Sequence, residues 1–171
     1  MSRYLDMTIQ RVIIKFKSKY FERGMNVVQT IQETEDEIAE EFALFDNWED
    51  KYEYIIDLGK KLQPLDSKFK VEENKIKGCQ SQVWLVADES DGRIYFKADS
   101  DAVIVRGLVS MLIRVLSGHT SQEILDAKLE FIDKIGMKNH LAQTRSNGLL
   151  SMVKQMKNYA LAYKMKEQLN G

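Results

Sequence analysis

The sequence predicts an α+β fold in which several helices pack against one small three-stranded antiparallel sheet. Apolar residues recur at helical spacing on both sides of residues 71–99, and within that stretch residues 82–99 show the pattern of a β-hairpin. The chain has 171 residues, of which 44% are hydrophobic and one is proline. This is enough for one hydrophobic core and too little for two complete domains of ordinary size.

Two helices are expected before the proline. A capping-box pattern at residues 34–37, followed by apolar residues at helical spacing, predicts the first helix. Asp46 or Asn47 can cap the second helix, which should end near Gly59. Around Pro64 the chain must leave helix, because proline lacks an amide donor and disfavours helical geometry in the residue before it.

The expected sheet is built around a hairpin. Residues 82–86 are rich in β-forming side chains, residues 89–92 supply a turn, and residues 93–98 alternate between apolar and polar. Residues 71–76 should add the third strand. Cys79 would then lie in the tight connection between two strands.

The pattern of residues 100–171 predicts a series of helices. Ser100 is a good N-cap for residues 101–117, which are apolar on nearly every side and should form a central, buried helix. A capping box at residues 120–123 and an apolar segment at residues 131–135 predict two short helices. The last helix is expected from about residue 146 to residue 169.

Charge is balanced overall but uneven along the chain. The net charge of −1 and the pI of about 6.2 argue against nucleic-acid binding and against an anionic membrane surface. Residues 1–28 carry six basic and two acidic side chains. Residues 29–57 carry one basic and eleven acidic side chains, and residues 58–171 carry 18 basic and 13 acidic side chains. The acidic block is predicted to form two solvated helix faces, with a surface that steers a basic partner as the alternative.

We expect residues 1–30 to be a basic N-terminal extension and residues 31–171 to be the folded domain. The extension could form an amphipathic helix, and we interpret it as a surface arm. A membrane-touching segment, or residues upstream of a true start at Met7 or Met25, are the alternatives. No stretch resembles a signal peptide.

Cys79 is the candidate reactive residue. One cysteine excludes an internal disulfide, a CxxC redox pair and a cysteine-rich zinc or iron–sulfur site, and it suits a reducing cytoplasm. Lys75 and Lys77 could favour the thiolate. The flanking residues suit a loop, namely Gly78, Gln80, Ser81 and Gln82. From these features alone, a reactive and a structural cysteine are equally open.

Other polar residues suggest less. His119 and His140 lack a second ligand at metal-like spacing, so no metal site is expected, and no phosphate-binding glycine motif is present. Arg145 lies near the expected start of the last helix. Together with the free amides there it could hold an anion such as a thiolate or persulfide, or it could simply face solvent.

Several stretches resemble the SufE family of sulfur-acceptor proteins. The most specific is the sequence around the sole cysteine, Ile76 to Trp84, which reads IKGCQSQVW. The resemblance spans about residues 36 to 163, and the other matching segments are residues 47–59, 99–102, 104–108, 140–141 and 145–149. It implies a SufE/IscU-like fold.

The resemblance also implies a function. Cys79 would accept sulfane sulfur from the persulfide of a SufS-like cysteine desulfurase, stimulate that enzyme, and pass the sulfur to a SufB-type iron–sulfur scaffold. The protein would be a carrier in the cytoplasm rather than an enzyme, with no cofactor of its own, because pyridoxal phosphate belongs to the partner. Arg145 matches the family's arginine beside the reactive loop, and Asp101 and His140 are assigned to the partner interface.

Attack of one thiolate on a persulfide resembles thiol–disulfide exchange and needs no cofactor. We expect the loop to tuck Cys79 against apolar surface and to swing it out on docking. The sequence departs from the family in its basic leader and at residues 142–144, where a proline is common. A carrier that feeds a different acceptor, a one-cysteine thiol redox enzyme and a domain with an inert cysteine are the alternatives.

Overall fold

The computed structural model describes residue 7 and residues 29–171, so the predicted amphipathic leader lies outside the described residues. Two helices, α2 (Ile31–Phe42) and α3 (Trp48–Lys61), open the described domain. The capping box of α2 is formed by Thr30 and Glu33 rather than by residues 34–37. The prediction placed this start four residues too late, since both positions offer a threonine followed by an acid.

The second helix begins where it was predicted. The Asn47 side chain accepts a hydrogen bond from the Asp50 N–H at 2.9 Å, so Asn47 rather than Asp46 is the cap. The helix ends at Lys61, and an extended connection runs past Pro64 to two short 3-10 turns, η1 (Ser67–Phe69) and η2 (Glu72–Asn74).

Within residues 29–171 the sheet has two strands, where three were predicted. Strands β1 (Val83–Ser90) and β2 (Arg93–Ser100) pair antiparallel along their whole length, which confirms the hairpin. The predicted third strand at residues 71–76 is wrong, because a helical turn forms there and only an isolated bridge joins Lys75 to Trp84. Local bonds favour the turn: Lys75 pairs with Glu72 at 2.7 Å, and the Asn74 amide donates to the Phe69 carbonyl at 2.8 Å.

Helix α4 (Val103–Leu116) is the centre of the core, as its apolar sequence predicted. It packs against α2, α3, β2 and α8. The expected cap is wrong, because Ser100 belongs to β2, where its hydroxyl donates to the Gln82 carbonyl at 2.7 Å. The helix instead begins after Ala102, whose methyl side chain offers no cap.

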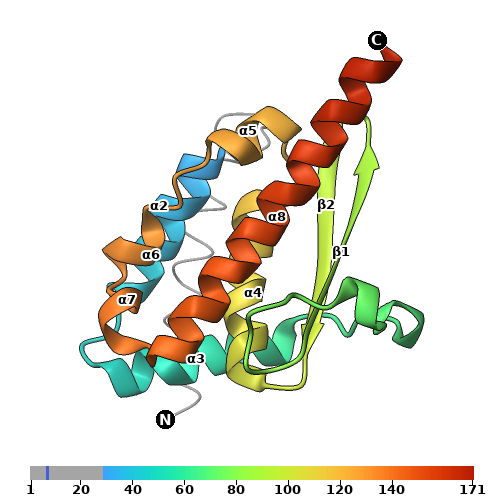
Figure 1. Cartoon of the computed structure of the whole chain (residues 1–171). Helices are drawn as coiled ribbons and strands as arrows, with labels where there is room; N and C mark the ends of the chain where they lie inside the picture. The colour runs from blue at the N-terminus through green and yellow to red at the C-terminus, as the bar shows by residue number, and fades with distance from the viewer. Residues whose placement is uncertain (1–6, 8–28) are drawn as a thin grey trace.

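Three short helices follow, α5 (Ser121–Asp126), α6 (Phe131–Lys134) and α7 (Met137–His140). The capping box of Thr120 and Glu123 confirms the predicted start of α5. Helix α8 (Gln143–Asn170) begins three residues earlier than predicted and runs between the hairpin on one side and α5, α6 and α7 on the other (Figure 1). The hydroxyls of Tyr159 and Tyr163 donate to carbonyls of β1 and so attach α8 to the sheet.

The acidic block is only partly a solvated face. Glu35 and Glu41 are buried: Glu35 accepts the Phe131 N–H at 3.1 Å, and Glu41 holds Arg114 with contacts of 2.7 and 2.9 Å. Glu37 also pairs with Arg114, at 2.8 Å. These three acids are structural, and the expectation of two fully solvated faces is wrong for them.

The fold class is α+β, as predicted. No helix within residues 29–171 is long and apolar enough to cross a membrane.

Candidate functional site

Cys79 lies in the loop that leads into β1, and both ends of this loop are held. On the entering side, the Ile76 N–H donates to the Val83 carbonyl at 2.8 Å. On the leaving side, the Gln82 N–H donates to the Asp101 carboxylate at 3.0 Å, and the Ser100 hydroxyl donates to the Gln82 carbonyl. The loop is therefore a short, anchored arch.

Gly78 shapes the arch directly before the cysteine. Its φ of 89° lies in the left-handed region that favours glycine. A Cβ at this position would lie 2.8 Å from the Ser151 Oγ on α8. The positive φ is what favours glycine here, and the short distance to Ser151 shows that the loop rests against α8.

The Cys79 side chain packs against the same helix. Its Sγ lies 3.6 Å from the Gly148 carbonyl oxygen, to which the thiol donates, and the residue is half-buried against the hydrophobic core. Burial raises the pKa of the Cys79 thiol. The protein thus holds its cysteine as a neutral, partly sheltered thiol.

The lysines expected to favour the thiolate do not have that effect here. Lys75 pairs with Glu72 instead, and desolvation is what shifts the pKa of Cys79, in the upward direction. The lysines near Cys79 in sequence therefore do not lower the pKa of its thiol in this structure.

The other predicted loop residues differ in exposure. Gln80 and Gln82 are exposed, whereas Ser81 is half-buried. Arg145 is exposed in the first turn of α8, one turn before Gly148. Since residues three apart lie on adjoining parts of one helix surface, Arg145 and Gly148 share a side of α8.

Asp101 and His140 each make a contact that holds a neighbouring segment. Asp101 is exposed and its carboxylate holds the loop at Gln82, so it has a structural contact in addition to any partner role. The His140 ring stacks on Trp48 with centroids 4.0 Å apart, and its carbonyl accepts the Tyr52 hydroxyl. These contacts fix α7 and, through it, the start of α8.

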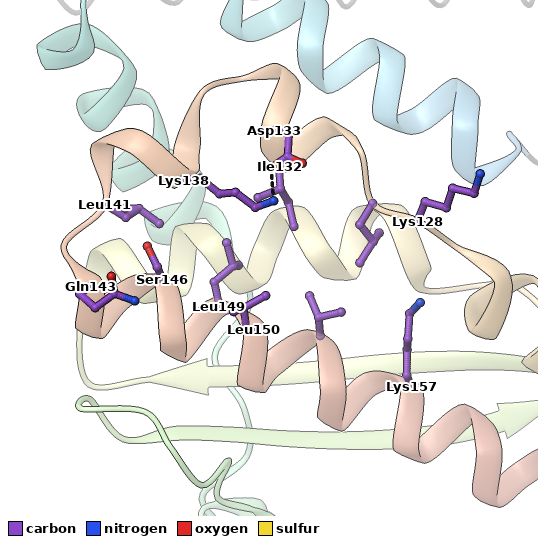
Figure 2. A pocket seen from close by; sticks show the side chains of 12 residues that line it. Lys128, Ile132, Asp133, Lys138, Leu141, Gln143, Ser146, Leu149, Leu150 and Lys157 are labelled. Atoms are coloured by element: carbon purple, nitrogen blue, oxygen red, sulfur yellow. Dashed lines mark ion pairs between the residues drawn. The ribbon is translucent and has the colours of Figure 1, made fainter.

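A groove of about 390 Å³ lies on the other side of α8 (Figure 2). Leu149 and Leu150 of α8 line it opposite Ile132 and Leu141, and Lys128 and Lys157 lie toward one end. Helix α8 is thus a wall between the groove and the Cys79 loop. Cys79 is not among the described residues that line this groove.

Sequence reasoning missed two features of the site: the position of Ser151 beside Gly78, and the contact between Gly148 and Cys79. The glycine was part of the matching motif, and its place inside an otherwise regular helix was the available signal. Within the described residues, no group of three His, Cys, Asp or Glu side chains is arranged to hold a metal ion.

Comparisons with known proteins agree with this architecture. Residues 36–160 match the family described as SufE: Fe-S metabolism associated domain. An uncharacterized SufE-like protein of Rhizobium meliloti (strain 1021) is 44% identical over 131 residues, which cover 73% of this chain and 93% of that protein.

A plant relative and a solved structure extend the comparison. SufE-like protein 1, chloroplastic/mitochondrial, of Arabidopsis thaliana is 40% identical over 143 residues, covering 81% of this chain and 38% of that protein. The solution structure of a hypothetical protein from Thermus thermophilus shares the fold with a TM-score of 0.63 and 17% identity, covering 75% of this chain and 94% of the other. With the family match spanning most of the described domain, the chain belongs to the SufE family of Fe–S metabolism proteins.

Proposed function

We propose that this protein is a sulfur acceptor in iron–sulfur cluster assembly, with Cys79 as the residue that carries the sulfur. Cys79 takes sulfane sulfur from the persulfide of a SufS-like cysteine desulfurase, and the loaded protein passes it to a SufB-type scaffold. The observation that supports this most is the position of the chain's one thiol, half-buried on an anchored loop against α8.

The transfer step needs only the thiol and the donor. The Cys79 thiolate attacks the outer sulfur of the desulfurase persulfide, a new S–S bond forms on Cys79, and the old S–S bond breaks to release the desulfurase thiolate. The proton of the Cys79 thiol leaves before attack. No net oxidation occurs, so the carrier requires no cofactor of its own, and pyridoxal phosphate acts only in the partner.

Docking has to change the environment of the thiol. Because burial raises the pKa of Cys79, the resting thiol is a poor nucleophile. We propose that the desulfurase draws the loop away from α8, with Gly78 as the flexible point, and so exposes the thiolate. Asp101 and His140 would lie in the interface.

Arg145 would stabilise the sulfur anion once the loop moves. It is a cation in the first turn of α8, beside the face on which Cys79 rests. Here the positive end of the helix and the guanidinium act together on an anion.

A one-cysteine thiol redox enzyme is the second candidate. Such enzymes use an exposed cysteine of low pKa. Cys79 is half-buried with a raised pKa, so the acceptor function is favoured. We therefore propose a carrier that serves as co-substrate and activator of a desulfurase in the cytoplasm.

Intact mass tests the proposal. The protein is incubated with an active desulfurase and cysteine, and its mass is compared with that of Cys79→Ser before and after thiol reduction. We expect a reducible gain of sulfur on the wild type only. If the desulfurase is active and the wild type gains no sulfur, the acceptor function is wrong, and turnover with peroxide and an external thiol would support the redox enzyme instead.

Arg145→Ala is tested in the same assay, with Lys154→Ala as the matched loss of an exposed cation on α8. Loss of a charge-assisted hydrogen bond worth about 1.5 kcal/mol should slow loading by roughly tenfold for Arg145→Ala and leave Lys154→Ala unchanged. Equal loading rates in the two variants would remove Arg145 from the mechanism.

A further inference from the structure

Three glycines lie within the described helices of this fold: Gly59 in α3, Gly107 in α4 and Gly148 in α8. Glycine is the poorest helix former apart from proline, so each position calls for a reason in the packing. The space that a Cβ would enter supplies that reason, and it differs among the three.

Gly59 and Gly107 are required by the contact between α3 and α4. A Cβ on Gly107 would lie 2.0 Å from the Ile55 carbonyl oxygen, and a Cβ on Gly59 would lie 2.3 Å from the Val103 carbonyl oxygen. Both distances are far inside van der Waals contact with backbone. These two glycines are explained by the folded protein as it stands.

Gly148 is different, although it is also buried. A Cβ there would lie 3.5 Å from the Cys79 Sγ and 3.9 Å from the Cα and Cβ of the same residue. These are ordinary contact distances. The folded protein with a bare thiol could accept alanine at this position, and outside the neighbouring backbone of α8 the three atoms nearest to that methyl group all belong to Cys79.

We propose that Gly148 is the residue that accommodates the outer sulfur of the Cys79 persulfide when the loop is closed on α8. This inference rests on the proposed function and adds a specificity-determining residue to it. The outer sulfur is bonded at about 2.05 Å from Sγ. When it turns toward α8, it comes well inside contact distance of a Cβ at position 148, whereas glycine leaves that volume free.

The backbone around Gly148 suits the loaded side chain as well. In the unloaded protein the thiol donates to the Gly148 carbonyl at 3.6 Å. A protonated S–SH group on Cys79 can donate its terminal proton to that same carbonyl, in place of the thiol proton. The closed loop then shelters the sulfane sulfur from small nucleophiles in solvent.

The test compares Gly148→Ala with the wild type in the full chain, with Asn158→Ala as control. Asn158 is exposed on the same helix, so its replacement also favours helix but is far along α8 from Cys79. Persulfide is made chemically: hydrosulfide displaces an aromatic thiolate from a mixed disulfide on Cys79, which leaves the S–SH group. Cyanide then removes the outer sulfur as thiocyanate, and the rate of thiocyanate formation is measured.

We expect release from Gly148→Ala to be roughly fivefold faster than from the wild type, the factor that corresponds to about 1 kcal/mol of overpacking. The alkylation rate of the unloaded thiol should stay within about twofold of the wild-type rate, since a methyl group at this distance makes normal contact with Sγ. Asn158→Ala should match the wild type in both assays.

Two results would overturn the role of Gly148. One is equal release of sulfur from Gly148→Ala and the wild type. The other is an equal acceleration of alkylation and of sulfur release, which would mean that alanine only loosens the loop. Failure of the wild type to gain sulfur from a desulfurase is a separate outcome that rejects the proposed function, and the chemically loaded protein still decides the role of Gly148.

Discussion

Cys79 combines two properties that a sulfur carrier has to balance. A carrier must react when it meets its partner and must resist oxidation between encounters. The thiol is half-buried, donates to the Gly148 carbonyl and has a raised pKa, all of which favour the resting state. In the proposed carrier, reactivity would therefore depend on movement of the loop rather than on a permanently activated thiolate.

The first prediction concerns the pH dependence of that thiol. Because burial raises the pKa of Cys79, alkylation by iodoacetamide should reach half its maximal rate at a higher pH in the folded protein than in the protein unfolded in urea. A native midpoint at or below the unfolded one would contradict the structure of the resting site.

The same shift predicts the sign of a stability effect. The folded state holds the thiol proton more tightly than the unfolded state, so the stabilisation is present below the ordinary thiol pKa of about 8.5 and is lost as pH rises through the higher folded value. Cys79→Ala should lack this loss. Denaturant unfolding of the two proteins across alkaline pH measures the difference.

At the scale of elements, the contact between α3 and α4 sets the second prediction. Gly107→Ala places a Cβ 2.0 Å from the Ile55 carbonyl oxygen, and the two helices must separate. We expect a loss of about 3 kcal/mol in the free energy of unfolding. Ser110→Ala in the same helix adds no atom and should change it by less than about 0.5 kcal/mol.

Chemical denaturation of both variants gives the measurement. A Gly107→Ala protein as stable as the wild type would mean that α3 and α4 do not approach as closely as described. The contrast with Gly148→Ala is informative, because alanine at position 148 should instead stabilise α8 by roughly 1 kcal/mol while weakening retention of the sulfur.

Asp99 joins β2, α4 and the connection that follows α3, and it sets the third prediction. This carboxylate is 3% exposed at the end of β2. It accepts the Leu65 N–H at 3.1 Å and pairs with Lys70 at 3.0 Å and with Arg106 of α4 at 3.3 Å. Burial alone would raise the pKa of Asp99, but these partners, with the Ser100 N–H, together lower it.

Replacing Asp99 by asparagine leaves two cations facing an uncharged group, and we expect a loss of roughly 3 kcal/mol. The pKa shift is downward, so the stability that Asp99 adds is complete above about pH 3.9, the ordinary aspartate pKa, and is lost as pH falls through the lower folded value. Unfolding curves at neutral and acidic pH test this. Asp91→Asn, in the hairpin turn, is the matched control and should be close to neutral at pH 7.

The elements also show what could be predicted from sequence and why. The hairpin was correct because alternation and turn residues are local signals. For the same reason the cap at Thr120 was correct, and Asn47 was one of the two caps that the sequence offered for α3. The third strand failed because Asn74 and the Glu72–Lys75 pair favour a helical turn that periodicity does not reveal. The packing of Gly148 against Cys79 joins residues 69 positions apart, so no local pattern contains it.

At the scale of the whole molecule, the described core lies within the part of the chain that matches the family. Its buried cluster runs from Ile38 to Ala160, and the family match covers residues 36–160. Thr30 caps α2, and Tyr163 ties the far part of α8 to β1. These contacts predict that residues 29–171 contain everything needed to fold.

The last prediction is therefore that a chain of residues 29–171 folds alone and loads sulfur as the full chain does. The deleted residues 1–28 carry six basic and two acidic side chains. If their deletion changes only the salt dependence of desulfurase binding, the result still agrees with an accessory arm. Denaturant unfolding and the mass assay, each run on both proteins, give the comparison. A loss of more than about 1 kcal/mol in the free energy of unfolding would show instead that the extension packs on the domain, and the proposed boundary at residue 30 would be wrong.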